Sequence, residues 1–148
     1  MMHQILVAMG DAADRQALCS CLEERFRARC AVLPAENGRE ALLLFEQYRP
    51  QVAILEIEMP QMDGLETARR IRQSAGACAI VFLTGHDDFH FAREALQLRA
   101  LDYLLKPWSE QALLPPVEEA LRLVEAYGAD PAARLLAGEY HLDGEALH

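Results

Sequence analysis

The sequence predicts a single α/β domain built on a doubly wound parallel sheet. Short apolar runs, typical of strands buried on both faces, alternate along the chain with stretches whose apolar residues recur every three or four positions, as on an amphipathic helix. The chain has 148 residues, which suffices for one domain with a sizeable core but not for two. We therefore expect strands and helices to alternate, with helices covering both faces of the sheet.

Five apolar segments are predicted to be the strands, and each is followed by residues typical of turns or helix starts. These segments are 5–8, 30–33, 52–55, 79–83 and 101–105. The stretches between and after them predict five helices, because their apolar residues lie three, four or seven positions apart. The inner faces of these helices include Leu22, Phe45, Ile71, Ala95 and Val117. Asp87 or Asp88 is expected to cap the fourth helix.

Two consecutive prolines, Pro115 and Pro116, fall within the last helical pattern. A proline inside a helix loses a backbone hydrogen bond and clashes with the preceding turn, whereas the first turn tolerates it. We therefore expect a short turn over residues 109–114 and a helix that begins near Pro116.

The alternation favours right-handed crossovers and a flavodoxin-like (βα)5 sheet with strand order 2-1-3-4-5. In that order the loops after strands one, three, four and five meet at one edge of the sheet. These loops carry Met9, Gly10, Asp11, Glu56, Thr84 and Lys106. An acid, a hydroxyl and an ammonium group at one edge are suited to an anion or phosphoryl site. Of 14 basic residues, Lys106 is the only lysine, which supports a role for a compact, mobile charge.

Three segments at this edge resemble the receiver domain of bacterial two-component response regulators. They are Ile54 to Leu65 (ILEIEMPQMDGL), Phe82-Leu83-Thr84 and Leu101 to Pro107 (LDYLLKP), and the resemblance covers roughly residues 4–126. Residues 87–96 look most like receivers attached to helical or LytTR-type DNA-binding output domains. The resemblance implies a phosphoacceptor aspartate after strand three and two acids after strand one that help hold Mg²⁺. It also implies that Thr84 and Lys106 contact the phosphoryl group and that Tyr103 reorients on activation.

The chain departs from this pattern at its most important positions. Glu56 stands where the family has the phosphoacceptor aspartate, and Met9 and Gly10 stand where it has the acidic pair. A thioether and a hydrogen offer Mg²⁺ no oxygen ligand, and glutamate is longer than aspartate by about 1.5 Å. We therefore predict a degenerate receiver without a metal or cofactor. In it, Glu56 reaches toward Lys106 and Thr84 and imitates a phosphorylated aspartate, with Tyr103 turned inward.

Other interpretations of the same edge stay open. If the first strand is shifted by one residue, Asp11 takes an acidic position, and the chain is a phosphorylatable receiver with a weakened Mg²⁺ site that uses Glu56 or Asp11. The pocket could also be vestigial, with Glu56 and Lys106 forming a partly buried ion pair. A third interpretation is a flavodoxin-like protein that binds FMN or another small phosphate ligand. The lack of a Gly-rich or Ser/Thr-rich loop after the first strand argues against it.

Composition limits the range of partners. The formal net charge of −9 disfavours direct binding to nucleic acid or to anionic membranes. No stretch reads as a signal peptide or a membrane span, and the four cysteines lack metal or disulfide spacing, so we expect a cytoplasmic protein with reduced thiols. We expect a non-enzymatic signalling module. Its partner would be a protein or a covalently linked output domain, with a histidine kinase and a homodimer through helix four, strand five and helix five as candidates.

Residues 127–148 are predicted to be an acidic tail beyond a receiver domain that covers residues 1–126. Pro131 to Leu136 could form a short helix, and the tail could instead begin a linker to an output domain. It is too short to be a DNA-binding domain itself. The sequence leaves open whether the chain is a stand-alone receiver or a part of a longer regulator.

Overall fold

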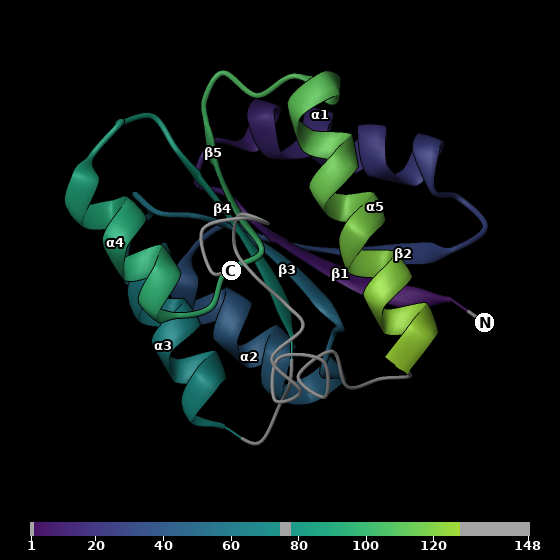
Figure 1. The fold of residues 1–148 in the computed structure, drawn as a ribbon, viewed down its shortest axis with the longest axis horizontal. Helices are drawn as coiled ribbons and strands as arrows, with labels where there is room; N and C mark the ends of the chain where they lie inside the picture. Colours follow the sequence, from purple (N-terminus) through teal and green to yellow (C-terminus); the bar gives the residue numbers. More distant parts are fainter. Residues whose placement is uncertain (1, 75–77, 128–148) are drawn as a thin grey trace, which may run out of the picture.

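The computed structural model describes residues 2–74 and 78–127, and over these ranges five strands alternate with five helices (Figure 1). The elements are β1 (His3–Ala8), α1 (Ala12–Arg25), β2 (Cys30–Ala35), α2 (Gly38–Tyr48), β3 (Val52–Glu56), α3 (Gly64–Gln73), β4 (Ala79–Thr84), α4 (Phe89–Gln97), β5 (Asp102–Leu105) and α5 (Glu110–Tyr127). The predicted alternation is therefore confirmed.

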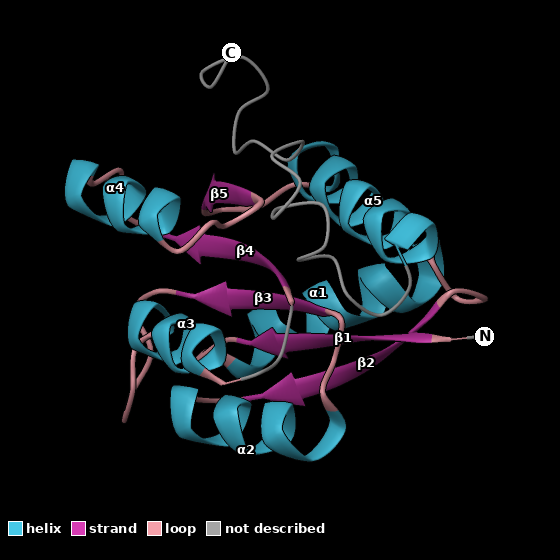
Figure 2. Cartoon of the chain, turned by 60° about the horizontal axis from the view of Figure 1, so that its bottom comes forward, coloured by secondary structure: helices cyan, strands magenta, loops and turns pink. Residues whose placement is uncertain are grey.

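The five strands form one parallel sheet in the order β2-β1-β3-β4-β5, as predicted. All strands run in the same direction, so their carboxyl ends meet at one edge (Figure 2). At that edge Glu56 pairs in register with Leu83, and Thr84 pairs with Leu105. The topology thus brings together the loops that carry the candidate site residues.

Alternating side chains of the strands divide the interior into two apolar layers. Ile5 and Val7 of β1 lie in the layer covered by α1 and α5. Leu6 and Ala8 of the same strand lie in the layer covered by α2, α3 and α4. The central strand β3 is buried along its whole length, as its continuous apolar run predicts for a strand covered on both faces. Figure 1 shows α1 and α5 together on one side of the sheet and α2 and α3 on the other.

Four helices begin at residues whose side chains satisfy a free backbone N–H group. These residues are Asp11, Asn37, Asp63 and Asp88. Asp88, one of the two candidates from the sequence, caps α4 by accepting a hydrogen bond from the N–H of His90. Short polar side chains at these positions stabilise helix starts by about 1 kcal/mol each. The loops at the carboxyl edge of the sheet therefore end at defined points.

The second strand extends further than the sequence suggested. We expected this strand to end at residue 33, but β2 continues through Pro34 and Ala35, and Pro34 pairs in register with Val7. Proline cannot donate a ladder hydrogen bond, but an edge strand leaves one side of its backbone unpaired. Because β2 is an edge strand, it accommodates the proline.

The prediction for the fifth helix was wrong. Instead of a turn followed by a helix from Pro116, α5 runs without interruption from Glu110 and contains both prolines. Its first turn is held by Ser109, whose carbonyl accepts hydrogen bonds from the N–H groups of Ala112 and Leu113. Leu113 and Val117, on either side of the prolines, are fully buried in the core. Tertiary packing therefore keeps the segment helical despite two missing backbone donors.

Across residues 2–74 and 78–127, none of the helices is both long and apolar enough to cross a membrane. The predicted helix over 131–136, and the rest of the tail from 128 onward, lie outside the described residues.

We predict that Pro115→Ala stabilises the domain. Pro115 is exposed, so the change restores a helical N–H group without opening a cavity. Proline is about 3 kcal/mol less favourable than alanine inside a helix, and the entropy that it removes from the unfolded chain offsets up to about 1 kcal/mol. We expect the free energy of unfolding in urea to rise by about 2 kcal/mol.

The matched control is Gln111→Ala, which alters an exposed residue of the same helix and is expected to change stability by less than about 0.5 kcal/mol. An unchanged or lowered stability of Pro115→Ala would contradict the prediction.

Candidate functional site

Glu56 is the last residue of β3, and its side chain is almost fully buried, with 6% of its surface exposed. Both carboxylate oxygens have partners. Oε1 accepts a hydrogen bond of 2.8 Å from the backbone N–H of Gly10, and Oε2 contacts the Nζ of Lys106. A buried carboxylate is costly unless it is paired and hydrogen-bonded. Gly10 and Lys106 together meet that requirement.

Lys106 follows β5, and its backbone position is fixed by the sheet. Its N–H donates a hydrogen bond of 2.7 Å to the carbonyl oxygen of Thr84 at the end of β4. Its side chain is 25% exposed and crosses the edge of the sheet to reach Glu56. Glu56 and Lys106 thus form the predicted ion pair at the carboxyl edge of the sheet.

Thr84 is buried, but its hydroxyl does not have the partner that we expected. It donates to the carboxylate of Glu58, at 3.0 Å from Oε1 and 2.9 Å from Oε2. A hydroxyl has a single proton to donate, so this contact occupies it. The expected contact of Glu56 with Thr84 is therefore replaced by a contact of Glu58 with Thr84.

Glu58 also binds the loop between β4 and α4. His86 Nδ1 lies 2.8 Å from Glu58 Oε2, and the backbone N–H of His86 donates to the Thr84 hydroxyl oxygen at 3.1 Å. Partial burial works to raise the pKa of Glu58, but the hydrogen bonds from His86 and Thr84 outweigh it and hold that pKa below its ordinary value. The carboxylate is therefore charged at neutral pH.

Tyr103 extends this set of contacts to β5. Its hydroxyl donates to the carbonyl oxygen of His86 at 3.1 Å and lies 3.4 Å from that of Asp88. The half-buried ring packs against the apolar layer that α2, α3 and α4 cover. Burial raises the pKa of the phenol above its usual value. Tyr103 is thus tied to the backbone of the loop that leads into α4.

The loop after β1 offers no carboxylate to the pocket. Met9 is fully buried in the apolar core, and its carbonyl oxygen accepts a hydrogen bond of 2.8 Å from Arg15. Gly10 contributes only its backbone N–H. Asp11 is exposed, and its carboxylate accepts the N–H of Asp14 at 2.8 Å to cap α1.

These residues do not fit Mg²⁺, the metal that the resemblance implies. Mg²⁺ prefers carboxylate, phosphate and water oxygens in an octahedral arrangement. Here a thioether and a glycine replace two carboxylates, and both oxygens of Glu56 are already engaged. Within the two described ranges, no group of three or more His, Cys, Asp or Glu side chains is placed to hold a metal ion.

Sequence reasoning gave no role at this edge to three residues that contribute to it: Glu58, His86 and Trp108. Glu58 stands two positions after Glu56, and His86 stands two positions after Thr84. Both residues therefore follow neighbouring strands at the same edge of the sheet, and this spacing could have indicated that their side chains meet. Trp108 Nε1 donates to Asp14 Oδ1 at 2.8 Å and links the loop after β5 to the first turn of α1. That contact joins segments 94 positions apart and has no local sequence signature.

The sequence matches the family model of the response regulator receiver domain over residues 5–118. An uncharacterised response regulatory protein of Vibrio cholerae is 43% identical over 116 residues, which cover 76% of this chain and 44% of that protein. The positive alginate biosynthesis regulatory protein of Pseudomonas aeruginosa is 33% identical over 118 residues, which cover 80% of this chain and 47% of that protein. The chain thus spans less than half the length of these two relatives.

Solved receiver domains have the same fold. The receiver domain of AraT, a response regulator from Geobacillus stearothermophilus, superposes with a TM-score of 0.75 at 32% identity, covering 85% of this chain and 98% of that one. A response regulator receiver domain from Clostridium thermocellum gives a TM-score of 0.76 at 28% identity, covering 84% and 98%.

We predict that two glycines of the site differ sharply in their tolerance of a side chain. A Cβ at Gly64 would lie 2.2 Å from the carbonyl oxygen of Glu56, so Gly64→Ala must displace the end of β3. A Cβ at Gly10 would meet no atom closer than the Pro60 Cδ at 3.4 Å. We expect Gly64→Ala to lower the free energy of unfolding by about 1–3 kcal/mol and Gly10→Ala to change it by less than about 0.5 kcal/mol.

Urea unfolding followed by circular dichroism measures both values. Equal stability of the two variants would contradict the prediction. It would show that the start of α3 can move away from the end of β3 without lowering the free energy of unfolding.

Proposed function

Since this chain belongs to the response regulator receiver family, we propose that it is an atypical receiver that signals through protein–protein contacts and is not switched by ordinary aspartyl phosphorylation. One observation carries the proposal. The carboxylate at the phosphoacceptor position belongs to a glutamate, and both of its oxygens are engaged, by Gly10 and by Lys106.

Phosphoryl transfer to Glu56 would need a free carboxylate oxygen aligned with the incoming phosphorus atom. Glu56 Oε2 instead contacts Lys106, the cation that the family uses for the phosphoryl group. The transferred group builds up negative charge, and metal ions are its main stabilisers in such reactions. With Met9 and Gly10 in place of two acids, the loop after β1 supplies none of the carboxylates for a metal. Lost alignment and lost charge stabilisation together lower the rate by orders of magnitude.

In this proposal Glu56 imitates part of the phosphorylated state. Its longer side chain brings a negative oxygen to Lys106, which is the contact that the resemblance assigns to a phosphoryl oxygen. The imitation is limited to Lys106, because the hydroxyl of Thr84 donates to Glu58. The pocket is therefore held in one charged arrangement, without a phosphate and without turnover.

The proposed partner is a protein or a linked output domain. Two relatives are named as regulators of gene expression or biosynthesis, a positive alginate biosynthesis regulatory protein and a transcriptional regulatory protein of Mycobacterium tuberculosis. Matched stretches cover less than half of each. We propose that the present domain, like a receiver in such a regulator, passes its state to an effector in the cytoplasm, and that a histidine kinase is a binding partner.

The surface formed by α4 and β5 supports a docking role, and we extend the proposal to a homodimer through it. Phe89, Leu96 and Leu105 are large apolar side chains with 73%, 51% and 44% of their surface exposed. Two of them lie on α4, at either end of the helix, and the third lies at the end of β5. A two-fold contact would bury each of these side chains against the same surface of a second copy.

The first test of the proposal is the intact mass after incubation with acetyl phosphate and Mg²⁺. We expect no phosphoryl adduct on the wild-type chain, and none on Glu56→Asp, because Met9 and Gly10 still supply no carboxylate and that of Asp11 caps α1. The double variant Gly10→Asp with Glu56→Asp restores two carboxylates at the pocket. There the adduct is expected, and it should disappear when Mg²⁺ is removed with EDTA.

A Mg²⁺-dependent adduct on the wild-type chain would refute the proposal in favour of a working phospho-receiver. An adduct on the single variant Glu56→Asp, with none on the wild type, would show that the longer side chain of residue 56 is by itself what prevents phosphorylation. Circular dichroism on each variant confirms that it is folded.

For the homodimer, we predict that Phe89→Ser weakens self-association, measured by light scattering after size-exclusion chromatography over a range of concentrations. Loss of a central aromatic contact typically costs about 2 kcal/mol, so the dimer dissociation constant should rise at least about tenfold. The matched control is Leu43→Ser, which removes an apolar side chain that is 65% exposed on α2 and lies outside the face. A wild-type chain that stays monomeric at all concentrations would exclude the homodimer and leave a different protein as the partner.

A further inference from the structure

We propose that Glu58 is the positioning residue that sets Tyr103 and the loop between β4 and α4, in place of the phosphoacceptor-equivalent Glu56. The inference rests on the proposed function, a receiver that is not switched by phosphorylation. It names the residue that controls the surface formed by α4 and β5 in such a receiver. It follows from the way in which the polar contacts at the edge of the sheet divide into two groups.

The first group is centred on Glu56 and lies inside the molecule. Its members are the N–H of Gly10 and the ammonium group of Lys106, which occupy the two oxygens of the carboxylate. The first partner comes from the loop after β1 and the second from the loop after β5. Neither contact passes through the hydroxyl of Thr84, so a change at Glu56 has no hydrogen-bonded route to Tyr103 through that side chain.

The second group is centred on Glu58 and runs to Tyr103. Its carboxylate accepts the hydroxyl proton of Thr84 and pairs with the ring of His86. The backbone N–H of His86 donates to the same hydroxyl oxygen, and its carbonyl oxygen accepts the proton of the Tyr103 hydroxyl. His86 thus connects Glu58 and Thr84 on one side with Tyr103 on the other.

These contacts fix the part of the loop that precedes α4. Thr84 is at the end of β4 and Asp88 caps α4, so only residues 85–87 separate the strand from the helix cap. Within this short segment, the ring and the N–H of His86 are both held by the group centred on Glu58. Tyr103 binds the carbonyl oxygens on both sides of Asp87, those of His86 and Asp88. Loss of Glu58 therefore frees the segment that gives Tyr103 its partners.

The two acids also differ in accessibility. The side chain of Glu58 is 38% exposed and that of His86 is 72% exposed, whereas Glu56 is buried. A protein that approaches this edge can touch Glu58 and His86 without opening the core. The position that controls Tyr103 is then one that a partner reaches directly.

The test compares Glu58→Ala, Glu58→Gln and Glu56→Gln by hydrogen exchange of the backbone amides of residues 85–88 and by the NMR signals of the Tyr103 ring. Tyr103→Phe assigns the ring signals. A typical intramolecular hydrogen bond corresponds to about a fivefold difference in opening. We expect amide exchange at His86 to rise at least about fivefold in Glu58→Ala, with a shift of the Tyr103 signals, and a smaller change in Glu58→Gln, which retains one acceptor oxygen.

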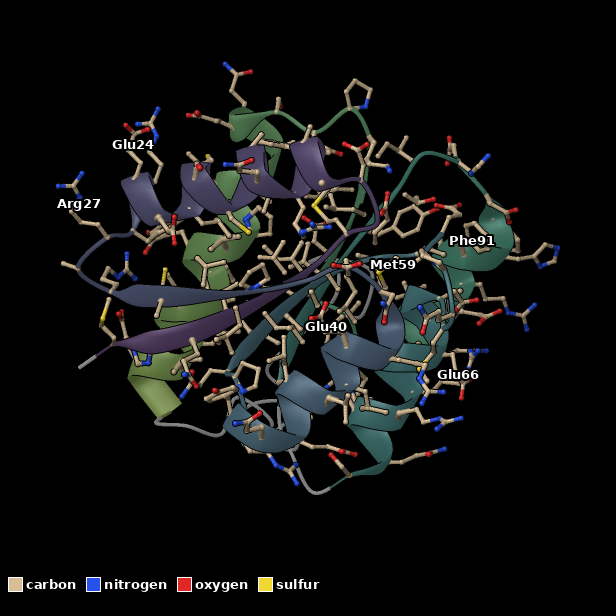
Figure 3. All side chains as sticks on the ribbon, turned by 180° about the vertical axis from the view of Figure 1, so that it is seen from behind. Glu24, Arg27, Glu40, Met59, Glu66 and Phe91 are labelled. Atoms are coloured by element: carbon tan, nitrogen blue, oxygen red, sulfur yellow. The ribbon has the colours of Figure 1, made fainter. Side chains whose placement is uncertain are left out.

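The matched control is Glu24→Ala, an exposed residue near the end of α1. Figure 3 shows Glu24 on the opposite side of the molecule from Phe91 in the first half of α4, and Met59, which follows Glu58 in the chain, lies nearer to Phe91 than to Glu24. This variant should leave the exchange of residues 85–88 and the Tyr103 signals unchanged. Glu56→Gln should leave the Tyr103 signals unchanged as well, even where it lowers the overall stability.

Two outcomes would overturn the inference: Tyr103 signals and loop exchange in Glu58→Ala that equal those of the wild type, or an equal response to Glu56→Gln. Neither outcome bears on the proposed function, which the phosphodonor experiment tests. Conversely, a phosphoryl adduct on the wild-type chain would refute the proposed function and leave the Glu58 contacts to be measured as before.

Discussion

The contact between Glu56 and Lys106 is the constraint on which the carboxyl edge of the sheet depends. A carboxylate that is only 6% exposed is costly to bury without partners, and the chain provides an ammonium group and a backbone N–H for it. Removing one partner of a buried pair typically costs about 3–5 kcal/mol. The loops after β1, β3 and β5 are therefore held together by a carboxylate whose two oxygens both have partners.

That constraint explains why a second acid matters at this edge. Gly10 and Lys106 engage both oxygens of Glu56, and the hydroxyl of Thr84 donates instead to the carboxylate of Glu58. A buried hydroxyl without a partner would itself be destabilising. The pocket therefore separates into an inner pair that holds the sheet edge and an outer cluster that holds the loop before α4. The same division keeps Tyr103 dependent on the outer cluster.

Most of the fold follows from local patterns in the sequence, but the partners in the site do not. Apolar runs and helical spacing predict the strand order and bring Glu56, Thr84 and Lys106 to one edge. The patterns failed at Pro34, Pro115 and Pro116, because an edge strand and a well-packed helix tolerate prolines that local propensity disfavours. They also failed to assign Thr84 to Glu58, since two acids two positions apart compete for one hydroxyl and only the geometry of the loop decides between them.

Glu56 is buried and Glu58 is partly exposed, and this difference in burial determines which of the two a partner protein can contact. A receiver that uses phosphate changes the charge of a buried group from within the pocket. Here the buried carboxylate of Glu56 already contacts Lys106, and in the proposed function no phosphoryl group is added to it. Glu58 and His86 are at the surface, where a partner's side chains can compete for their hydrogen bonds. Because exposed pairs contribute at most about 1 kcal/mol, such competition costs little, and the loop before α4 becomes the adjustable part of an otherwise fixed pocket.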